Sequence, residues 1–300
     1  MATITFHGAA QEVTGSCHLL ESQAIGRILL DCGMHQGGDA VRRIQDEEFA
    51  FDPATIDAVV LSHAHLDHSG LLPRLYHEGF TGPIICTRAT ADLLDVMLND
   101  SVGLYLRDLE RTNVRNARRG RPLIEPVYTQ EDVVTVLSHC RGYRYQEAIA
   151  LGEKASVRFY DAGHILGSAI VEVTLQEQGE EKVLVFSGDL GKDDSVLMNA
   201  PAALERAEVL LVESTYGDRE HRGEQDTVNQ LRDILSETWD QGGCVMIPAF
   251  AVGRTQDLLF HLGCLYNDGE LDNWQIFLDS PMAIAVTRVY DRWLDRKSVV

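Results

Sequence analysis

Short apolar segments that end at a polar residue or a glycine recur through the first two thirds of the chain, and each predicts a buried strand. Residues 3–22 predict two strands joined by a glycine-containing loop, and residues 27–33 continue them as a meander. Later strands are expected at residues 59–61, 83–87, 157–161 and 182–186. Apolar residues at helical spacing predict helices over residues 71–78, 90–116 and 129–139.

The pattern changes after about residue 206, where predicted strands and helices alternate. Strands are expected at 209–213, 244–250 and 274–279, each followed by a helix, at about 227–241, 254–266 and from 281 onward. Strand–helix alternation implies parallel strands joined by crossovers. We therefore expect an α/β (α+β) protein with two domains, residues 1–206 and residues 207–300.

The stretch Val59–Gly70, V-V-L-S-H-A-H-L-D-H-S-G, carries the densest candidate chemistry. Its metal-capable side chains follow directly on a predicted strand: His63, His65, Asp67 and His68. Imidazole and carboxylate suit zinc, manganese or iron, and no cysteine lies among them. The first two histidines can point to one side and the last two residues to a second position, so one segment can serve two metals. A histidine-rich surface turn is the alternative, and this density of ligands disfavours it.

Other predicted strands also end in a metal-capable side chain. Asp31 ends the strand before Gly33, and Asp189 lies between two glycines after residues 182–186. His164 lies between Gly163 and Gly167, whose missing side chains let the backbone come close. A carboxylate such as Asp189 can bridge two cations through its two oxygens. We expect these side chains to gather at the same end of the sheets.

H-A-H-L-D-H resembles the signature motif of the metallo-β-lactamase-fold hydrolases, a binuclear superfamily built as an αββα sandwich. Asp31, His164 and Asp189 match further motifs of that family in the same order. The resemblance implies that one metal is held by His63, His65 and His164, the other by Asp67 and His68, and that Asp189 bridges them. It implies that Asp31 holds a ligand histidine in the right tautomer. Two Zn²⁺ ions are expected in an intact site, with Mn²⁺ as the alternative.

Three later motifs resemble the β-CASP subgroup of this superfamily, whose members cut RNA or DNA. They are E-S-T-Y-G, P-A-F-A-V-G-R and D-S-P-M-A, beginning at residues 213, 248 and 279. Glu213 matches an acid that supports a catalytic histidine in that subgroup. No histidine follows His261, so the subgroup's two later histidine motifs are absent. We therefore expect a C-terminally truncated piece of a longer enzyme, lacking one ligand of the second metal and catalytically weak.

The function expected from this resemblance is metal-dependent hydrolysis of phosphodiesters in single-stranded RNA, with DNA second. The expected catalytic residues are Asp67 and Asp189, which orient the nucleophile, with Glu213 and Asp31 in support. Endonucleolytic and 5′-exonucleolytic cleavage both stay open. A small-molecule hydrolase acting on thioesters or lactams is the second hypothesis, and an inactive scaffold subunit of a processing complex is the third. Small-molecule hydrolases of this superfamily would lack the region after residue 209, so its presence argues against the second hypothesis. Scaffold subunits arise by loss of metal ligands, so the intact ligands argue against the third.

The formal charge of −20 and a pI near 4.8 are unusual for a nucleic-acid enzyme, which normally presents a basic surface. One counter-patch of six arginines lies between residues 107 and 121, and three of them share a helix face; a solvated helix surface is the alternative. The absence of an eighteen-residue apolar run and of a secretory start predicts a cytoplasmic protein without membrane contact. The six scattered cysteines are expected to be reduced, and a homodimer is compatible with the sequence.

Overall fold

The computed structural model describes residues 2–219 and 223–294. Its first sheet has six strands in sequential order, of which β1, β2 and β3 are antiparallel and the remaining pairs are parallel. The strands are β1 (Thr3–Phe6), β2 (His18–Ser22), β3 (Gly26–Leu30), β4 (Ala58–Val60), β5 (Ile84–Thr87) and β6 (Cys140–Tyr143). The predicted meander at the start of the chain is therefore confirmed.

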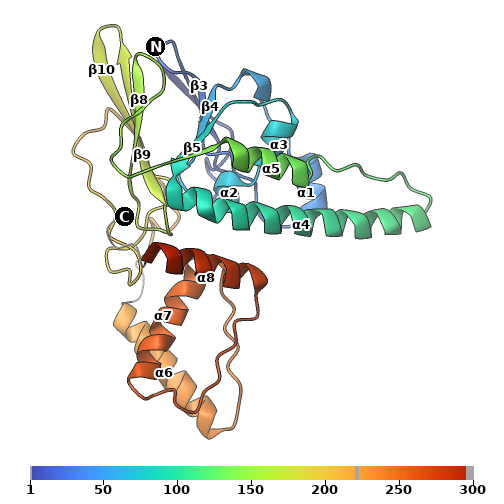
Figure 1. Ribbon diagram of the computed structural model, residues 1–300, viewed down its shortest axis with the longest axis vertical. Helices are drawn as coiled ribbons and strands as arrows, with labels where there is room; N and C mark the ends of the chain where they lie inside the picture. Colours follow the sequence, from blue (N-terminus) through green and yellow to red (C-terminus); the bar gives the residue numbers. More distant parts are fainter. Residues whose placement is uncertain (1, 220–222, 295–300) are drawn as a thin grey trace.

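The second sheet has five strands in the order β11-β10-β9-β8-β7 and faces the first. Its strands are β7 (Ile149–Ala150), β8 (Ala155–Asp161), β9 (Ala169–Glu177), β10 (Glu180–Phe186) and β11 (Val209–Leu211). All neighbours are antiparallel except β10 and β11, which run parallel. The α/β prediction with two packed sheets is confirmed (Figure 1).

Helices cover the face of the first sheet that points away from the second sheet (Figure 1). They are α1 (Ala40–Asp46), α2 (Leu66–Ser69), α3 (Leu72–His77), α4 (Arg88–Arg118) and α5 (Gln130–His139), and a 3-10 turn spans Pro53–Thr55. On the outer face of the second sheet a small apolar cluster packs against Leu190 and Leu204, which lie in loop segments. Of the four layers expected for an αββα sandwich, residues 2–219 form three: one layer of helices and two sheets. No helix in these residues covers the outer face of the second sheet.

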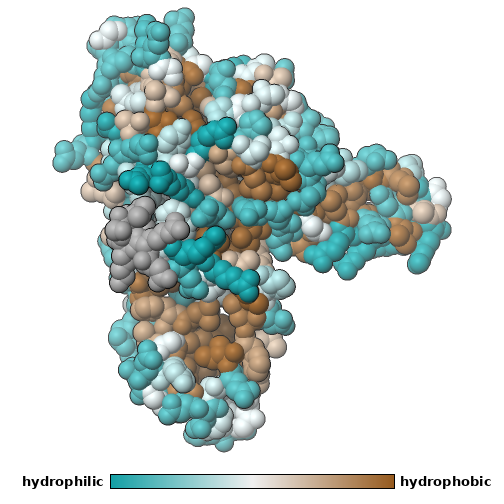
Figure 2. Space-filling model, viewed as in Figure 1, coloured by the Kyte–Doolittle hydropathy of each residue, from teal (hydrophilic) through white to brown (hydrophobic). Residues whose placement is uncertain are grey.

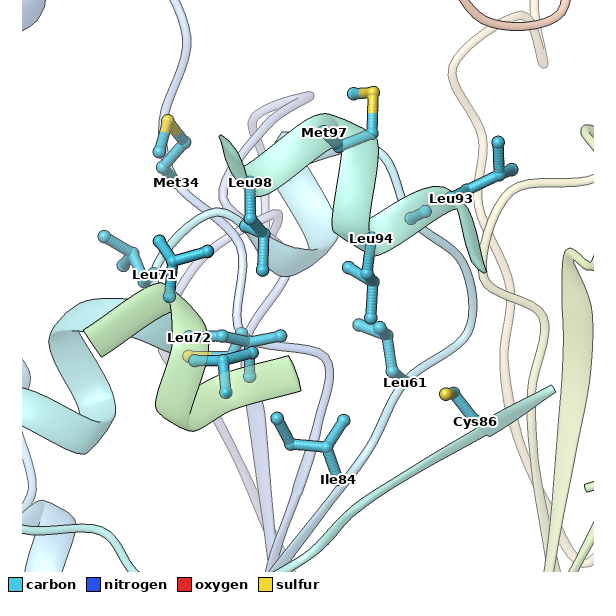
Figure 3. Close-up of a cluster of buried hydrophobic side chains, with 14 of the residues drawn as sticks. Met34, Leu61, Leu71, Leu72, Ile84, Cys86, Leu93, Leu94, Met97 and Leu98 are labelled. Carbon is cyan, nitrogen blue, oxygen red and sulfur yellow. The ribbon is translucent and has the colours of Figure 1, made fainter. Parts of the chain in front are cut away.

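Alternation along the strands builds two cores, because successive side chains point to opposite faces of a sheet. Leu29 and Val59 face the helices, whereas Ile28 and Val60 face the second sheet, where they meet Val171. Both faces are therefore apolar, which explains the nearly continuous hydrophobic runs in the sequence. Figure 3 shows side chains of α4 lying over the helical face of the sheet: Leu93, Leu94, Met97 and Leu98 above Leu61, Ile84 and Cys86.

The predicted helices after residue 209 are confirmed as α6 (Glu224–Asp240), α7 (Arg254–Asn267) and α8 (Pro281–Leu294). The parallel sheet predicted beside them is wrong for residues 2–219 and 223–294. β11 joins β10 of the second sheet, and residues 244–250 and 274–279 form no strand. Their apolar side chains stay in solvent, since Met246, Phe250 and Phe277 are 91%, 82% and 81% exposed. A strand needs a hydrogen-bonded neighbour, and these segments find none in the described part of the chain.

The C-terminal helices touch the sandwich through α8. The indole of Trp293 donates to Asp92 of α4 over 2.8 Å, and the Tyr290 hydroxyl accepts the Leu166 amide over 3.1 Å. α6 and α7 share a small apolar cluster of their own, centred on Leu235 and Leu262. The division at residue 206 stays a prediction, and β11 shows that the chain still pairs with the second sheet at residues 209–211.

β6 is a strand that the sequence did not predict. α5 ends at His139, where its predicted helix also ends, and Cys140 opens β6. β6 pairs with β5 in parallel, with Cys140 opposite Ile84. The pairing with β5 therefore makes a strand of residues that carry no strand pattern of their own.

Candidate metal centre

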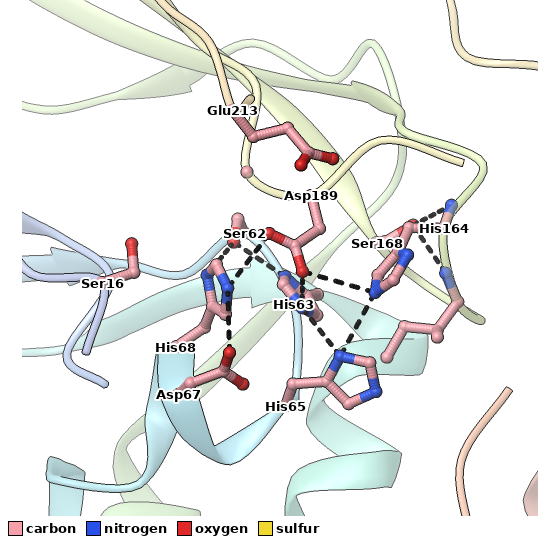
Figure 4. A network of polar contacts seen from close by, with 12 residues as sticks. Ser16, Ser62, His63, His65, Asp67, His68, His164, Ser168, Asp189 and Glu213 are labelled. Atoms are coloured by element: carbon pink, nitrogen blue, oxygen red, sulfur yellow. Dashed lines mark hydrogen bonds and ion pairs between the residues drawn. The ribbon is translucent and has the colours of Figure 1, made fainter. Parts of the chain in front are cut away.

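The candidate side chains come from three segments that each leave the carboxyl end of a strand. Residues 62–65 and the short helix α2, which carries Asp67 and His68, follow β4, whereas the loops of residues 162–168 and 187–191 follow β8 and β10. Because these strand ends lie at one edge of the two packed sheets, the loops meet there (Figure 4). All six residues predicted as metal ligands are drawn together: His63, His65, Asp67, His68, His164 and Asp189.

Four of these side chains surround one point. The ligand atoms of His63, His65, His164 and Asp189 lie within 4.8 Å of one another. Nδ1 of His65 is 3.1 Å from Nε2 of His63 and 3.2 Å from Nε2 of His164. The Asp189 carboxylate oxygen Oδ2 is 3.7 Å and 3.5 Å from the same two Nε2 atoms.

A buried hydrogen-bond network settles which nitrogen of His63 faces this point. Asp31, fully buried, accepts the Ser62 amide at 2.7 Å through Oδ1 and the Ser62 hydroxyl at 2.8 Å through Oδ2. Because the Ser62 hydroxyl uses its proton to donate to Asp31, its oxygen can only accept a hydrogen bond from Nδ1 of His63, which lies 3.0 Å away. Nε2 of His63 is therefore the unprotonated nitrogen, directed at His65 and His164.

We call the four side chains described above, His63, His65, His164 and Asp189, the first group. A second group, formed by Asp67 and His68 together with the shared Asp189, lies beside it. Nε2 of His68 is 3.2 Å from Oδ1 of Asp189 and 3.9 Å from Oδ2 of Asp67. The opposite nitrogen of His68, Nδ1, is 2.7 Å from Oδ2 of Asp31. Asp189 thus reaches the two groups with different oxygens, which is the geometry expected of a bridging carboxylate.

The environment separates the protonation states of the two groups. Burial lowers the pKa of His63, His65 and His164, with His65 at about 3. Burial would also lower the pKa of His68, but the charges and hydrogen bonds of Asp31 and Asp189 raise it well above its ordinary value. In return His68 outweighs the effect of burial on Asp189 and lowers the pKa of that carboxyl to about 2. Burial raises the pKa of Asp67.

The first group fits a divalent cation. Three neutral imidazoles direct nitrogens at one another, 3.1 and 3.2 Å apart, and a single proton on Nδ1 of His65 can fully satisfy only one of these two contacts, so the other pairs two lone pairs. A cation between them removes the repulsion, and the neighbouring carboxylate supplies the fourth ligand. Nitrogen and oxygen donors without sulfur match zinc, manganese or iron.

Glycines let the loops that carry His164 and Asp189 touch. A side chain on Gly191 would lie 1.8 Å from the carbonyl oxygen of Gly163, and the Gly191 amide donates to the Ala162 carbonyl over 2.8 Å. Gly163 itself has φ +67°, in the left-handed region that favours glycine. The contact therefore fixes the positions of the two ligand-bearing loops relative to each other through their backbones.

We expect Gly191→Ala to destabilise the protein by about 2 kcal/mol or more and to weaken metal binding, because the clash is with backbone that cannot rotate away. Gly103→Ala is the matched control: it lies in α4 with nothing within 4 Å of the added carbon. In a helix interior this change should stabilise the fold by roughly 0.5–1 kcal/mol. Urea unfolding and metal titration of both variants measure the effects. Equal stability and equal metal affinity of the two variants would contradict the proposed role of the contact between the loops.

Glu213 lies on the side of Asp189 away from Asp67 (Figure 4). Its carboxylate accepts the Leu190 amide at 2.8 Å and the Thr215 amide at 3.3 Å. Its own amide donates to the Ser187 hydroxyl at 3.1 Å. Glu213 thus fastens the loop that carries Asp189, whereas its predicted support of a catalytic histidine stays a prediction.

Sequence reasoning missed three serines that hold the site together. Ser62 joins Asp31 to His63, and Ser16 donates a further hydrogen bond to Asp31 at 3.2 Å. Ser168 accepts the amides of His164 and Ile165 at 3.0 and 3.2 Å, which closes the loop around His164. The position of Ser62 directly before the histidine cluster was a usable signal, but nothing in the sequence linked Ser16 to the site.

Comparison with known proteins agrees with this geometry. Residues 11–143 match the family model described as the Metallo-beta-lactamase superfamily. The matched residues end before the second sheet, which starts at β7, and so cover part of the two-sheet sandwich. The match includes Asp31 and the cluster His63–His68, so the recognition of the superfamily from those residues is confirmed. The superfamily match and the convergent His/Asp group, two members of which lie beyond residue 143, together imply divalent metal binding by this chain.

The curated relatives extend over nearly the whole chain. Ribonuclease TTHA0252 of Thermus thermophilus is 43% identical over 286 residues, covering 95% of this chain and 60% of that protein. An RNase J-like protein of Methanocaldococcus jannaschii is 32% identical over 302 residues, 99% of this chain and 63% of that protein. Transcription termination factor FttA of the same organism is 32% identical over 301 residues, 98% of this chain and 44% of that protein.

These relatives are consistent with the β-CASP subgroup recognised from the later motifs, and their similarity runs past the metallo-beta-lactamase domain into α6, α7 and α8. The chain spans less than two thirds of the length of each of them. No described helix is both long and apolar enough to cross a membrane.

Proposed function

We propose that the protein is a metal-dependent phosphodiesterase that hydrolyses single-stranded RNA. The observation that carries the proposal is the convergence of three neutral imidazoles and the Asp189 carboxylate at the meeting point of three loops. The ribonuclease names of two relatives described above favour RNA over a small-molecule substrate. The preference for RNA over DNA rests on those relatives.

His63, His65 and His164 would hold one metal, Asp67 and His68 the other, and Asp189 would contact both. Bound divalent ions at these positions would lower the pKa of a water and neutralise charge on the phosphate. The chain's own residues prepare that chemistry. Asp31 accepts a hydrogen bond from Nδ1 of His68 and so leaves Nε2 directed at Asp67 and Asp189.

Asp67 is the residue we assign to orient the attacking water and to receive its proton. Its pKa is raised by burial, which brings this carboxyl nearer to the range in which it can exchange protons at neutral pH. Asp189, with its lowered pKa, stays ionised and is suited to hold cations instead. We propose zinc as the native metal, because its preferred donors are those of the first group, with Mn²⁺ second.

We further propose that residues 207–300 belong to a β-CASP domain beside the metallo-beta-lactamase core of residues 1–206, and that RNA enters between the two. The E-S-T-Y-G, P-A-F-A-V-G-R and D-S-P-M-A motifs support this division. A cytoplasmic location and a homodimer are the corresponding proposals for the cell. Size-exclusion chromatography with light scattering tests the second.

The deciding experiment combines metal analysis with cleavage assays on one preparation. We expect up to two zinc ions per chain and metal-dependent cleavage of a 5′-labelled single-stranded RNA that chelator abolishes and zinc restores. The same preparation is offered single-stranded DNA, a thioester and a β-lactam. Hydrolysis of the thioester or lactam without any cleavage of RNA would make the small-molecule hydrolase correct, and bound zinc without any hydrolysis would favour the scaffold role.

A further inference from the structure

The outer half of α4 projects beyond the rest of the molecule as a single arm (Figure 1). Its inner half packs on the first sheet through buried side chains as far as Leu109. Beyond that residue every position up to Leu123 is exposed or only half-buried. We call residues 104–124 the arm; it consists of the end of α4 and the segment that returns toward α5.

One face of the arm is lined by arginines. Six exposed arginines lie between residues 107 and 121: Arg107, Arg111, Arg115, Arg118, Arg119 and Arg121. The first four are spaced by four, four and three residues, so they share one side of the helix. No aspartate or glutamate occurs from Arg111 to Ile124, although the whole chain carries 46 acidic against 26 basic residues. The arm is thus a local concentration of positive charge on an acidic protein.

Most of this charge is not used within the fold. Arg111 pairs with Asp108 at 3.1 Å, and Arg107 donates to the Gly103 carbonyl. Within residues 2–219 and 223–294, Arg115, Arg118, Arg119 and Arg121 form no ion pair; the pairs there involve other side chains. Like charges four residues apart destabilise a helix, so the spacing carries a cost.

The helix dipole accounts for only part of the pattern. Cations are favoured in the last turn of a helix, where Arg115 and Arg118 lie. The effect fades beyond one turn, so it does not explain Arg107 and Arg111, and Arg121 lies past the helix end. A general gain in helix stability is therefore not sufficient reason for the cluster.

The arm is braced as a fixed structure. The Asn113 side chain both donates to the Ile124 carbonyl and accepts the Ile124 amide, each at 2.8 Å. At its base the Tyr105 hydroxyl accepts the Val127 amide at 3.1 Å and a Gln45 amide hydrogen at 3.0 Å. The backbone that carries the arginines is thus held in place before any partner arrives, which lowers the entropy cost of binding.

The other end of the same helix is fastened to the metal centre. The hydroxyls of Thr87 and Thr90 donate to the Gly167 carbonyl at 2.7 and 2.9 Å, in the loop that carries His164. At 1.5 Å per residue, Arg111 lies roughly 35 Å along the axis from the start of α4. The helix thus connects the candidate active site rigidly to a distant basic surface.

We propose that the arginine face of the arm binds the phosphate backbone of the RNA substrate at a distance from the cleaved bond. The inference rests on the proposed function and adds a second, sequence-independent contact to it. Guanidinium groups suit phosphate because they present several donors in a fixed plane. Binding to the arm raises the affinity for an RNA that is long enough to contact both the arm and the candidate active site. A substrate too short to reach the arm is hydrolysed equally well with or without it.

A protein partner is the competing occupant. Leu104, Val114 and Leu123 are 49%, 46% and 60% exposed on the arm, and Figure 2 shows apolar and polar patches side by side there. Protein interfaces, however, gather apolar residues at their centre and are depleted in charge there, whereas here single apolar side chains are interleaved with unpaired arginines. Charge complementarity therefore favours a polyanion.

The test neutralises four arm residues together: Arg111→Gln, Arg115→Gln, Arg118→Gln and Arg119→Gln. Glutamine keeps the helix propensity close to that of arginine. The matched control replaces four exposed arginines on other surfaces: Arg42, Arg158, Arg206 and Arg292, each to Gln. Both sets change the net charge equally. Binding of a 40-nucleotide single-stranded RNA is measured in the His65→Ala background, so that cleavage does not interfere.

We expect the arm variant to bind this RNA about 10-fold more weakly at 0.1 M salt, and the slope of log affinity against log salt to fall by roughly 2–3. The control should stay within about 2-fold of its parent. Hydrolysis of bis(p-nitrophenyl) phosphate by the otherwise unchanged protein should be equal for wild type and arm variant.

An arm variant that binds long RNA like the control overturns the proposal, as does loss of a dimer without loss of RNA binding, which would assign the arm to a protein contact. If the arm variant binds long RNA normally while the wild type hydrolyses the simple diester, only the arm proposal has failed and the proposed function stands. A wild-type protein that hydrolyses neither diester nor RNA contradicts the proposed function itself.

Discussion

His65→Ala is expected to lower RNA cleavage by more than about 100-fold and to remove one metal ion per chain. Nδ1 of His65 is the nitrogen that lies near those of both His63 and His164, so its loss opens the first group. Without metal the variant should be no less stable than wild type, because the removed imidazole faces other nitrogens. Bound zinc should therefore raise the melting temperature of wild type more than that of the variant.

His77→Ala is the matched control for this prediction. His77 is an exposed histidine of α3 whose ring lies 3.2 Å from Asp132, and it is not among the side chains that converge at the site. It should keep full metal content and full cleavage. Metal analysis by mass spectrometry, thermal unfolding with and without zinc, and cleavage rates are measured on the three proteins. Retained metal and activity in His65→Ala would remove this residue from the site.

Asp31→Ala is expected to cost about 3–5 kcal/mol of folding free energy, the range for breaking a buried ionic network. The carboxylate is fully buried and accepts four hydrogen bonds, from the Ser62 amide and from side chains of Ser62, Ser16 and His68. Removing it leaves all four donors without this acceptor in a region that excludes water. The free energy of unfolding in urea measures the loss.

Asp31→Asn separates the structural role from the role in metal binding. One amide oxygen can still accept the Ser62 amide, and the hydroxyls of Ser62 and Ser16 can rotate, so the fold should be largely kept. The new NH₂ group faces Nδ1 of His68, which must then accept a hydrogen bond and carry its proton on Nε2. Zinc affinity at the second group should fall about 10–100-fold. An unchanged affinity would show that Asp31 does not set the tautomer of His68.

Several parts of the fold could be read directly from local patterns. Strands β1 to β5 and helices α3, α4 and α5 lie within a few residues of their predicted bounds, because strand and helix periodicities are strong in buried elements. β6 could not be found in this way. Cys140–Tyr143 is short and largely exposed, and it is a strand only because β5 pairs with it. The strands predicted at 244–250 and 274–279 failed for the complementary reason, since no described segment pairs with them.

The sequence by itself determined which side chains could bind metal and that they follow strands, because H-x-H-x-D-H and the glycine-flanked His164 and Asp189 are local features. Only the tertiary structure decided how they act together. The 3.2 Å contact between His65 and His164 depends on the segments after β4 and β8, which belong to different sheets. The network from Asp31 through Ser62 to His63 depends on the parallel pairing of β3 with β4. Such contacts join residues far apart in the chain, and no local pattern specifies them.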